Sequence, residues 1–321
     1  MALGATARRL AIVAGVAAAM VSMGLPMGGT LAADATQAAC VDGYRVVKPI
    51  SAITPQAVVA TWPSSALMAG GAKLGFGARV AAIARKNADG VKRLATFPAG
   101  ADSGFMGIDG SKQHGYWAVG YARTSSSVAP LIARRKPGQS AWTRVSAPRP
   151  PAAGGSLSDV DIGAGGKPWA AGYRIGAPGV RRPWVIAREG GRWVDKSPAL
   201  KWGTTGMLAS VSSSAQGGTW IAGWTSRFGR SKPYLAKRVS GGWKQATLPP
   251  LGEAVVTEVK VPSRSSGWAV GYRYEQGVRR PLELRWNGVA WREKAVPLAG
   301  SGAAFLTGLA VNAGKVTVTG A

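Results

Sequence analysis

The stretch Trp268-Ala269-Val270-Gly271-Tyr272 decides the fold, because related stretches recur along the chain. The clear copies are Trp117–Tyr121, Trp169–Tyr173 and Trp220–Trp224, and the weaker ones are Leu67–Gly71 and Thr317–Ala321. Their first residues lie 50, 52, 51, 48 and 49 positions apart. A fixed period of about 50 residues is typical of propellers and solenoids. The sequence therefore predicts a repeat architecture.

Each unit contains signals for four short strands. After the motif comes an apolar run that opens on Pro130, Pro183, Pro233 or Pro281. A turn follows, and then a second aromatic position at Trp142, Trp193, Trp243 and Trp291. A short run such as Leu157–Ile162 precedes the motif. Four antiparallel strands per unit make the blade of a β-propeller. We expect each proline to be the first residue of its strand, where a sheet tolerates proline.

The two ends of the chain predict how the ring closes. Asp42–Pro49 has the pattern of the last strand of a unit, and Tyr44 lies 47 residues before Val91. The chain finishes at Ala321 with the first half of a unit. We therefore expect an all-β, six-bladed β-propeller of four-stranded antiparallel blades, with the N- and C-terminal strands sharing one blade. Such closure removes exposed sheet edges.

Residues 1–33 have the pattern of an export signal, with Arg8 and Arg9 followed by the apolar stretch Leu10–Met23. That stretch is too short for a convincing membrane span, although an uncleaved anchor is the alternative. We expect residues 34–321 to form a single propeller domain outside the cell, with no transmembrane span in the mature chain. The lone cysteine, Cys40, has no partner for an internal disulfide, and we interpret it as a small, partly buried side chain.

The repeat unit resembles the Trp-Ala-Val-Gly tryptophan-repeat propellers of secreted bacterial proteins, which are kelch-like in layout. The resemblance covers residues 41–321 and implies the fold rather than an activity. The sequence departs from the pattern at Leu67 and Thr317, where tryptophan is replaced. It also lacks the Ser-x-Asp-x-Gly-x-Thr-Trp turns that mark sialidase-like propellers.

The aromatic and glycine positions of the repeat are interpreted mainly as structural. We expect the motif tryptophans to fill the core between blades, because aromatic side chains dominate core burial. The motif glycines are expected where a neighbouring backbone needs room. The outer tryptophans, from Trp142 to Trp291, leave a neutral-sugar lectin open as an alternative function.

Positive charge is a feature that the fold does not require. Lys and Arg number 40 against 14 Asp and Glu, for a net charge of +26, and only Arg8 and Arg9 lie in residues 1–33. A soluble small domain needs a net charge of only about 2–8. Many of the cations share one repeat position, between the second and third strands: Lys73, Arg79, Arg123, Arg174, Arg181, Arg182, Arg227, Arg230, Lys232, Arg273, Arg279 and Arg280.

Rotational repetition would put these twelve side chains on one face, although overall composition alone is the simpler explanation. Clustered cations attract polyanions, and arginine forks onto carboxylate or phosphate oxygens. We therefore predict a secreted, non-enzymatic binding or adhesion propeller. Its partner would be a wall phosphate polymer, an acidic polysaccharide, lipid head groups or extracellular DNA, with no cofactor. No groove-reading helix or recognised nucleic-acid module is present.

Catalytic signals are sparse. The chain has one histidine, His114, in an expected turn, and no Cys/His cluster that would hold zinc. The acids Asp109, Asp159, Asp161 and Glu258 fall on or near first strands and could point into a central channel. Asp159 and Asp161 are two apart and share a face, which makes them weak candidates for acid–base chemistry. The alternative function is therefore a hydrolase or lyase of acidic polysaccharide; otherwise these acids simply face water.

Overall fold

The computed structural model describes residues 53–62, 65–73, 78–148, 154–176, 179–199, 205–297, 302–312 and 315–320. This part of the chain is all-β, with 22 strands and a single 3-10 turn at Ala164–Gly166. The expected export signal at 1–33, Cys40 and the expected strand at 42–49 lie outside the described residues. Their interpretation stays a prediction.

Five antiparallel sheets, each of four consecutive strands, follow one another along the chain. The first contains β1 (Thr54–Trp62), β2 (Ser65–Lys73), β3 (Arg79–Asn87) and β4 (Gly90–Phe97). The second contains β5 (Asp102–Ser111), β6 (Gly115–Arg123), β7 (Val128–Arg135) and β8 (Thr143–Val145). The third contains β9 (Gly155–Ile162), β10 (Pro168–Gly176), β11 (Val180–Glu189) and β12 (Arg192–Asp195).

The fourth sheet contains β13 (Thr205–Ser214), β14 (Gly218–Arg227), β15 (Arg230–Val239) and β16 (Gly242–Gln245). The fifth contains β17 (Ala254–Lys260), β18 (Gly267–Glu275), β19 (Val278–Trp286) and β20 (Trp291–Lys294). A hairpin of β21 (Leu306–Asn312) and β22 (Lys315–Gly320) follows. Four strands per unit are therefore confirmed in these five sheets.

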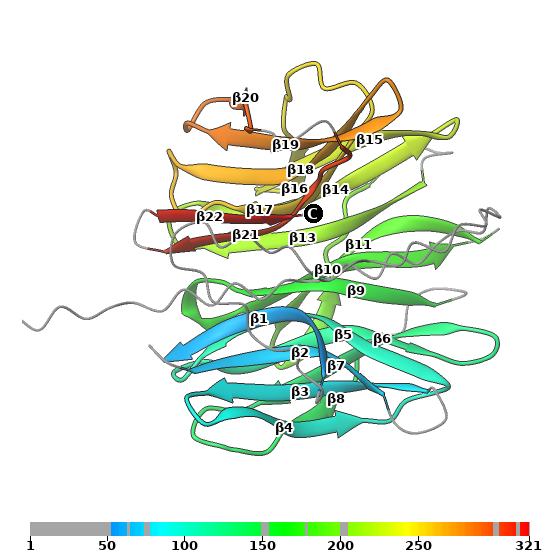
Figure 1. Ribbon diagram of the computed structural model, residues 1–321, viewed down its shortest axis with the longest axis vertical. Helices are drawn as coiled ribbons and strands as arrows, with labels where there is room; N and C mark the ends of the chain where they lie inside the picture. Colours follow the sequence, from blue (N-terminus) through cyan, green and yellow to red (C-terminus); the bar gives the residue numbers. More distant parts are fainter. Residues whose placement is uncertain are drawn as a thin grey trace, which may run out of the picture.

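Neighbouring sheets pack in chain order through their first strands. Strand β5 contacts β9, β9 contacts β13, β13 contacts β17 and β17 contacts β21. Figure 1 shows the same succession, from the first sheet (blue and cyan) to the last hairpin (red). This is the arrangement of a β-propeller. The described residues supply two strands of a sixth unit, so six blades and their closure stay a prediction.

The first strand of every unit carries one unpaired residue at the same repeat position. These bulge residues are Gln56, Met106, Ser158, Ala209, Thr257 and Thr307. They follow the spacing of the tryptophan motif to within one residue, and the β21–β22 hairpin shares the feature. That hairpin is therefore built like the first half of the five complete sheets.

The motif glycines are required by close approach of the adjacent first strand. A Cβ at Gly120 would overlap the carbonyl oxygen of Gly104, and the same overlap with a first-strand carbonyl occurs in every unit. The positions concerned are Gly70, Gly120, Gly172, Gly223, Gly271 and Gly320. The expectation that a neighbouring backbone needs this room is confirmed.

Tryptophans fill the spaces between sheets. Trp117, Trp169 and Trp220 are buried, whereas Trp268 is half-buried. Each of the three buried motif tryptophans meets an outer tryptophan of the next sheet edge-on: Trp117 with Trp193, Trp169 with Trp243 and Trp220 with Trp291, at centroid distances of 5.3, 6.1 and 5.5 Å. Since Trp193 and Trp291 are buried, these two cannot serve as the sugar platform of a neutral lectin.

The expected place of the prolines is wrong. Pro130 is the third residue of β7, and Pro183, Pro233 and Pro281 are the fourth residues of β11, β15 and β19. The outer strands of these four sheets are only three or four residues long and end before they reach the prolines. At the proline, the third strand therefore has no fourth strand beside it. No backbone N–H is needed there to pair with an outer strand.

Candidate functional site

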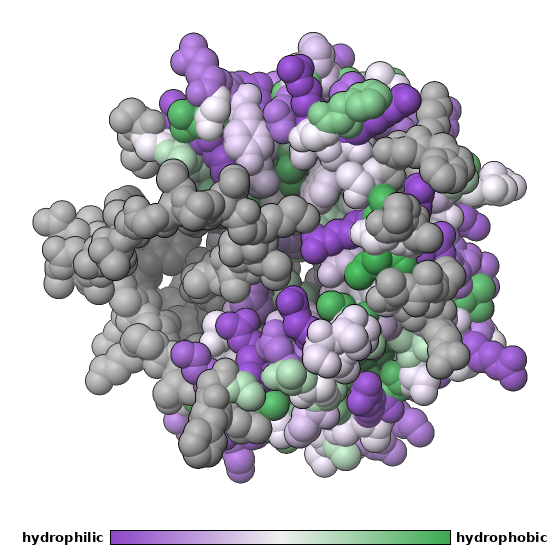
Figure 2. All heavy atoms as spheres, turned by 90° about the vertical axis from the view of Figure 1, so that its right-hand side faces the viewer, coloured by the Kyte–Doolittle hydropathy of each residue, from purple (hydrophilic) through white to green (hydrophobic). Residues whose placement is uncertain are grey.

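The hairpins between second and third strands lie at one face of the molecule. Strands β1, β3, β17, β19 and β21 point the same way in Figure 1, so these hairpins gather on its right-hand side. Figure 2 views that side, where hydrophilic side chains cover much of the described surface. All twelve predicted cations lie at this end of their sheets. They belong to strand ends rather than to loops, because the strands continue almost to the turn. We call the twelve the basic hairpin face.

Four of the five complete sheets place two of these cations directly opposite each other across the hairpin. The opposed pairs are Lys73 with Arg79, Arg174 with Arg182, Arg227 with Arg230, and Arg273 with Arg280. Directly opposed like charges destabilise a sheet. The exception is the second sheet, where Arg123 faces Val128.

In the third and fifth sheets, acidic residues offset part of this repulsion. Arg174 forms an ion pair with Asp195 at 2.5 Å, and Arg273 pairs with Glu275 and Glu293 at the same distance. Arg181 and Arg279 lie over Tyr173 and Tyr272, at 4.7 and 5.0 Å from the ring centroids. These cations are held by their own sheets.

The fourth sheet differs, because its cations line a pocket. Arg230 and Lys232 are exposed, and neither forms an ion pair or side-chain hydrogen bond with another described residue. Both line a pocket of 510 Å³ formed by the fourth sheet and by the segment 246–253 that leads to the fifth sheet. Its remaining lining comes from Thr225, Ser231, Pro233, Gln245, Ala246, Leu248, Pro249, Leu251, Gly252 and Glu253.

The sequence interpretation missed a second set of cations at the opposite ends of the third strands. Arg134 and Lys237 pair across the sheet with the motif residues Trp117 and Trp220. Arg134 lies 4.9 Å from the Trp117 ring centroid and Lys237 lies 5.5 Å from that of Trp220. Their repeat position, directly after the apolar run, was visible in the sequence. We assign them to packing, since a cation over an aromatic face stabilises both groups.

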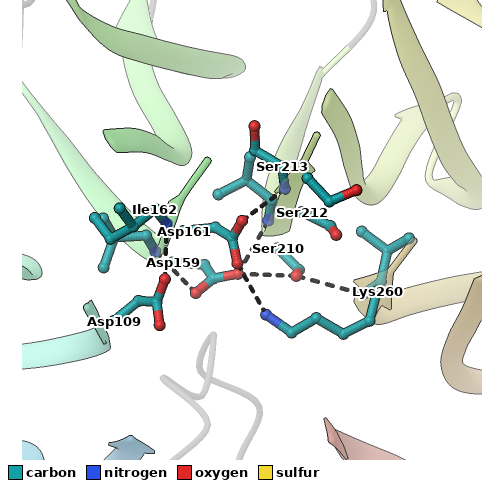
Figure 3. Close-up of polar contacts among 12 residues, drawn as sticks. Asp109, Asp159, Asp161, Ile162, Ser210, Ser212, Ser213 and Lys260 are labelled. Carbon is teal, nitrogen blue, oxygen red and sulfur yellow. Dashed lines mark hydrogen bonds and ion pairs between the residues drawn. The ribbon is translucent and has the colours of Figure 1, made fainter. Parts of the chain in front are cut away.

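The acidic candidates converge on the inner strands around Lys260. Asp109 comes from β5, Asp159 and Asp161 from β9, and Glu258 with Lys260 from β17. Figure 3 shows Lys260 directed toward the aspartates. Its Nζ lies 3.4 Å from Asp161 Oδ1 and 4.0 Å from Glu258 Oε1. The side chains of Asp161 and Lys260 are 14% and 28% exposed.

The expectation that these acids simply face water in a channel is wrong. Asp159 accepts hydrogen bonds from the backbone N–H of Val160 and Val211 and from the hydroxyl of Ser210, at 2.8 to 3.0 Å. The backbone N–H of Ser213 donates to Asp161 at 2.6 Å. These carboxylates therefore bind the next sheet.

Asp109 and Glu258 make the same contact in their own units. Asp109 accepts from the N–H of Ile162 at 2.7 Å, and Glu258 accepts from the N–H of Leu309 at 2.6 Å. In each case the donor is about one repeat away on the next first strand. Each first strand is the edge of its sheet, so the N–H groups on its free side have no strand partner and are satisfied by side chains. The four carboxylates therefore link consecutive sheets.

Burial and mutual charge change the pKa values of the acidic residues and the lysine in this cluster. Burial raises the pKa of Asp161 to about 6, with Lys260 opposing the shift and Asp109 adding to it. Burial likewise raises the pKa of Glu258 to about 7 and raises the pKa of Asp159. Burial opposes the charged form of Lys260, but the surrounding carboxylates outweigh it and raise its pKa.

We expect the protein to lose stability as the pH rises from about 4.5 to 7.5. A carboxyl with a raised pKa favours folding below its ordinary pKa, and this contribution is lost as the pH passes its folded-state value. For Asp161 and Glu258 each contribution is on the order of 2–3 kcal/mol. Chemical unfolding across this range should show the decline, and Asp161→Asn should make it shallower. A stability that increases from pH 5 to 7.5 would contradict the assignment.

Other site chemistry is sparse within the described residues. No group of three metal-ligating side chains gathers there. No helix in the described ranges has the length and hydropathy of a membrane span. His114 lies in the turn between β5 and β6, where Ser111 Oγ is 3.4 Å from its Nδ1. Nothing in this geometry gives His114 a catalytic partner among the described acids.

Comparison with known proteins identifies the fold. The sequence matches no protein-family model and no curated protein. An ulvan lyase, a polysaccharide lyase solved bound to -[GlcA(1-4)Rha3S]-, has a TM-score of 0.58 at 11% identity, covering 84% of this chain and 75% of that chain. A Trypanosoma rangeli sialidase in complex with the inhibitor DANA has a TM-score of 0.54 at 13% identity, covering 83% and 52%.

A Dyadobacter fermentans protein of unknown function has a TM-score of 0.51 at 12% identity, covering 84% of this chain and 93% of that chain. At these identities the likeness establishes a β-propeller fold and no activity. The tryptophan-repeat, kelch-like type stays a resemblance, because no family match supports it.

Proposed function

We propose that this protein is a secreted, non-enzymatic binding propeller that holds an anionic polymer through its basic hairpin face. The observation that carries the proposal is the directly opposed cation pair, repeated in four of five sheets at one face. Each pair costs stability in the free protein. A polyanion lying across the face would relieve that repulsion in several sheets at once.

The chemistry of the face fits carboxylate, sulfate or phosphate groups. Arginine guanidinium groups bind such oxygens in a forked geometry, and the face contains ten arginines and two lysines. A wall phosphate polymer, an acidic polysaccharide and extracellular DNA all meet this requirement. The ulvan lyase shows that a propeller can hold an acidic saccharide.

The competing function is cleavage of an acidic polysaccharide, as a hydrolase or a lyase, by the inner carboxylates. The raised pKa values of Asp161 and Glu258 favour it, because such shifts are common in acid–base catalysts. Against it, the oxygens of Asp159 already accept three hydrogen bonds. These contacts give Asp159 and Asp161 a structural role between neighbouring sheets. We therefore favour polyanion binding over catalysis. Turnover of an acidic glycan that is abolished in an Asp159→Asn, Asp161→Asn variant would reverse this choice.

We expect removal of charge from the basic hairpin face to weaken polyanion binding at least tenfold at low salt. The test variant replaces five exposed cations by glutamine: Lys73, Arg123, Arg227, Arg230 and Lys232. Each phosphate or carboxylate contact releases counterions, so the slope of log K against log salt should also fall. Titration calorimetry with alginate, polyphosphate and DNA at several salt concentrations measures both quantities.

The matched control removes five exposed cations from the opposite ends of the sheets: Lys92, Lys136, Arg192, Arg292 and Lys315. Both variants lose the same net charge. The control should retain most of the affinity. Equal losses in the two variants, or no polyanion binding by the unaltered protein, would overturn the proposal.

A further inference from the structure

The tip of the β14–β15 hairpin presents an apolar ring to solvent. Phe228 and Gly229 form its two-residue turn, with φ angles of 55° and 80°. A bulky side chain rarely adopts positive φ, and such strain often marks a functional position. Phe228 is also 90% exposed, the largest exposure among the large hydrophobic side chains in the described ranges.

The turn itself does not require the ring. The corresponding turn of the β18–β19 hairpin has Gln276 and Gly277 at φ angles of 50° and 80°. Gln276 therefore adopts the same backbone conformation as Phe228 with a polar side chain. The turn therefore does not account for a phenylalanine here, and the largely exposed ring leaves an apolar face available to a ligand.

Phe228 adjoins the two cations of the pocket along the chain. The Arg227 guanidinium lies 5.0 Å from the centroid of the Phe228 ring, and Arg230 follows two residues later. Arg230 and Lys232 then line the pocket formed by the fourth sheet and the segment 246–253. The exposed ring of Phe228 and the two cations that line the pocket, Arg230 and Lys232, therefore lie on one short segment, residues 227–232.

The pocket offers three kinds of contact. Pro233, Leu248 and Leu251 supply apolar surface, and Thr225 and Gln245 supply hydroxyl and amide groups. The carboxylate of Glu253, which accepts a hydrogen bond from the Ser231 N–H at 3.3 Å, adds an acceptor. Ligand sites typically combine apolar walls with a few polar groups of this kind.

We propose that Phe228 and this pocket form a subsite for an acidic saccharide. Arg230 and Lys232 bind the carboxylate or sulfate of one sugar, whose ring packs against the apolar wall. Phe228 stacks on a neighbouring sugar ring. The inference rests on the proposed function and narrows its ligand from any polyanion to an acidic polysaccharide.

The acceptor in the pocket distinguishes saccharides from other polyanions. Glu253 repels a phosphate chain, which presents only negative oxygens, whereas sugar hydroxyls can donate to it. An anionic membrane surface would accept the exposed ring and the flanking cations. It would leave the hydroxyl and amide groups of the recessed pocket without partners, however, and the saccharide is favoured for that reason.

The test measures binding of a short alginate oligosaccharide, polyphosphate, single-stranded DNA and phosphatidylglycerol vesicles. Phe228→Gln keeps the turn, as Gln276 shows, and should weaken alginate binding about five- to tenfold while leaving polyphosphate within about twofold. Arg230→Gln with Lys232→Gln should weaken alginate binding at least tenfold. Lys92→Gln with Arg192→Gln is the control of equal charge and should bind as the unaltered protein does.

Protection from hydrogen exchange locates the oligosaccharide independently of affinity. Alginate should protect residues 225–233 and 245–253, and a neutral dextran oligosaccharide should not. The subsite is refuted if Phe228→Gln binds alginate normally, or if DNA or vesicles depend on Phe228 more than alginate does. Those results leave the basic hairpin face intact as a polyanion site. Loss of all polyanion binding in the five-cation variant with no effect of Phe228→Gln would likewise refute only the subsite.

Discussion

Replacing Gly120 by alanine is expected to destabilise the protein by at least about 3 kcal/mol, or to prevent folding. The added Cβ would overlap the carbonyl oxygen of Gly104 and lie 2.7 Å from Phe105 Cα. Both atoms belong to the backbone of β5, so no side-chain rotation can relieve the overlap. Moving β5 away would in turn disturb the next interface, where Gly107 lies against the β9 backbone at Asp159.

Urea unfolding followed by tryptophan fluorescence and circular dichroism measures this effect. Gly242→Ala is the matched control, because a Cβ there has no atom within 4 Å. It should change the free energy of unfolding by no more than about 0.5 kcal/mol. Similar stabilities for the two variants would show that close strand packing is not why the motif contains glycine.

Replacing Lys260 by methionine is expected to cost about 3–5 kcal/mol at pH 8. The substitution removes the cation that faces Asp161 and Glu258 and leaves the carboxylates of three sheets to repel one another. Their pKa values should then rise further, because the group that opposed the shifts is gone. At pH 5 more of these carboxyls are protonated, so the loss should shrink markedly. A neutral carboxyl still accepts a backbone N–H through its carbonyl oxygen.

Denaturant unfolding of the variant at pH 5 and pH 8 measures this difference. Lys294→Met removes an exposed lysine from the same sheet and should have little effect at either pH. Combining Lys260→Met with Asp161→Asn should recover part of the loss at pH 8, since one of the repelling charges is removed. A loss that is equal at both pH values would indicate a packing defect instead of charge repulsion.

The positions within each unit could be predicted from the sequence because they follow from local strand order. The motif fixes the second strand, and the glycine turn and outer tryptophan fix the third and fourth. Rotation then brings equivalent residues to one face, and for this reason Lys73 and Arg273 could be predicted to share an end of the molecule. The prolines were misplaced because the length of an outer strand has no clear sequence signal.

Interactions between sheets could not be predicted in this way. Asp159 is bound by Val211, and Asp161 by Ser213, about one repeat further along. Whether an inner carboxylate faces a channel or a neighbouring backbone depends on the bulge and on the twist between sheets. The sequence also left open which cations find an acid within their own sheet, as Arg174 of β10 does with Asp195 of β12.

The sequence by itself determined the repeat, its four-stranded unit and the end of each sheet where the cations gather, because these features are periodic and local. Only the tertiary structure decided that the acids link neighbouring sheets and that Arg230 and Lys232 line a pocket. It also placed the Phe228 ring in solvent. The links between sheets depend on surfaces from different units meeting in space, and the pocket and the exposed ring depend on how the fourth sheet and its connections pack, so packing distance and burial, rather than sequence spacing, set the energy.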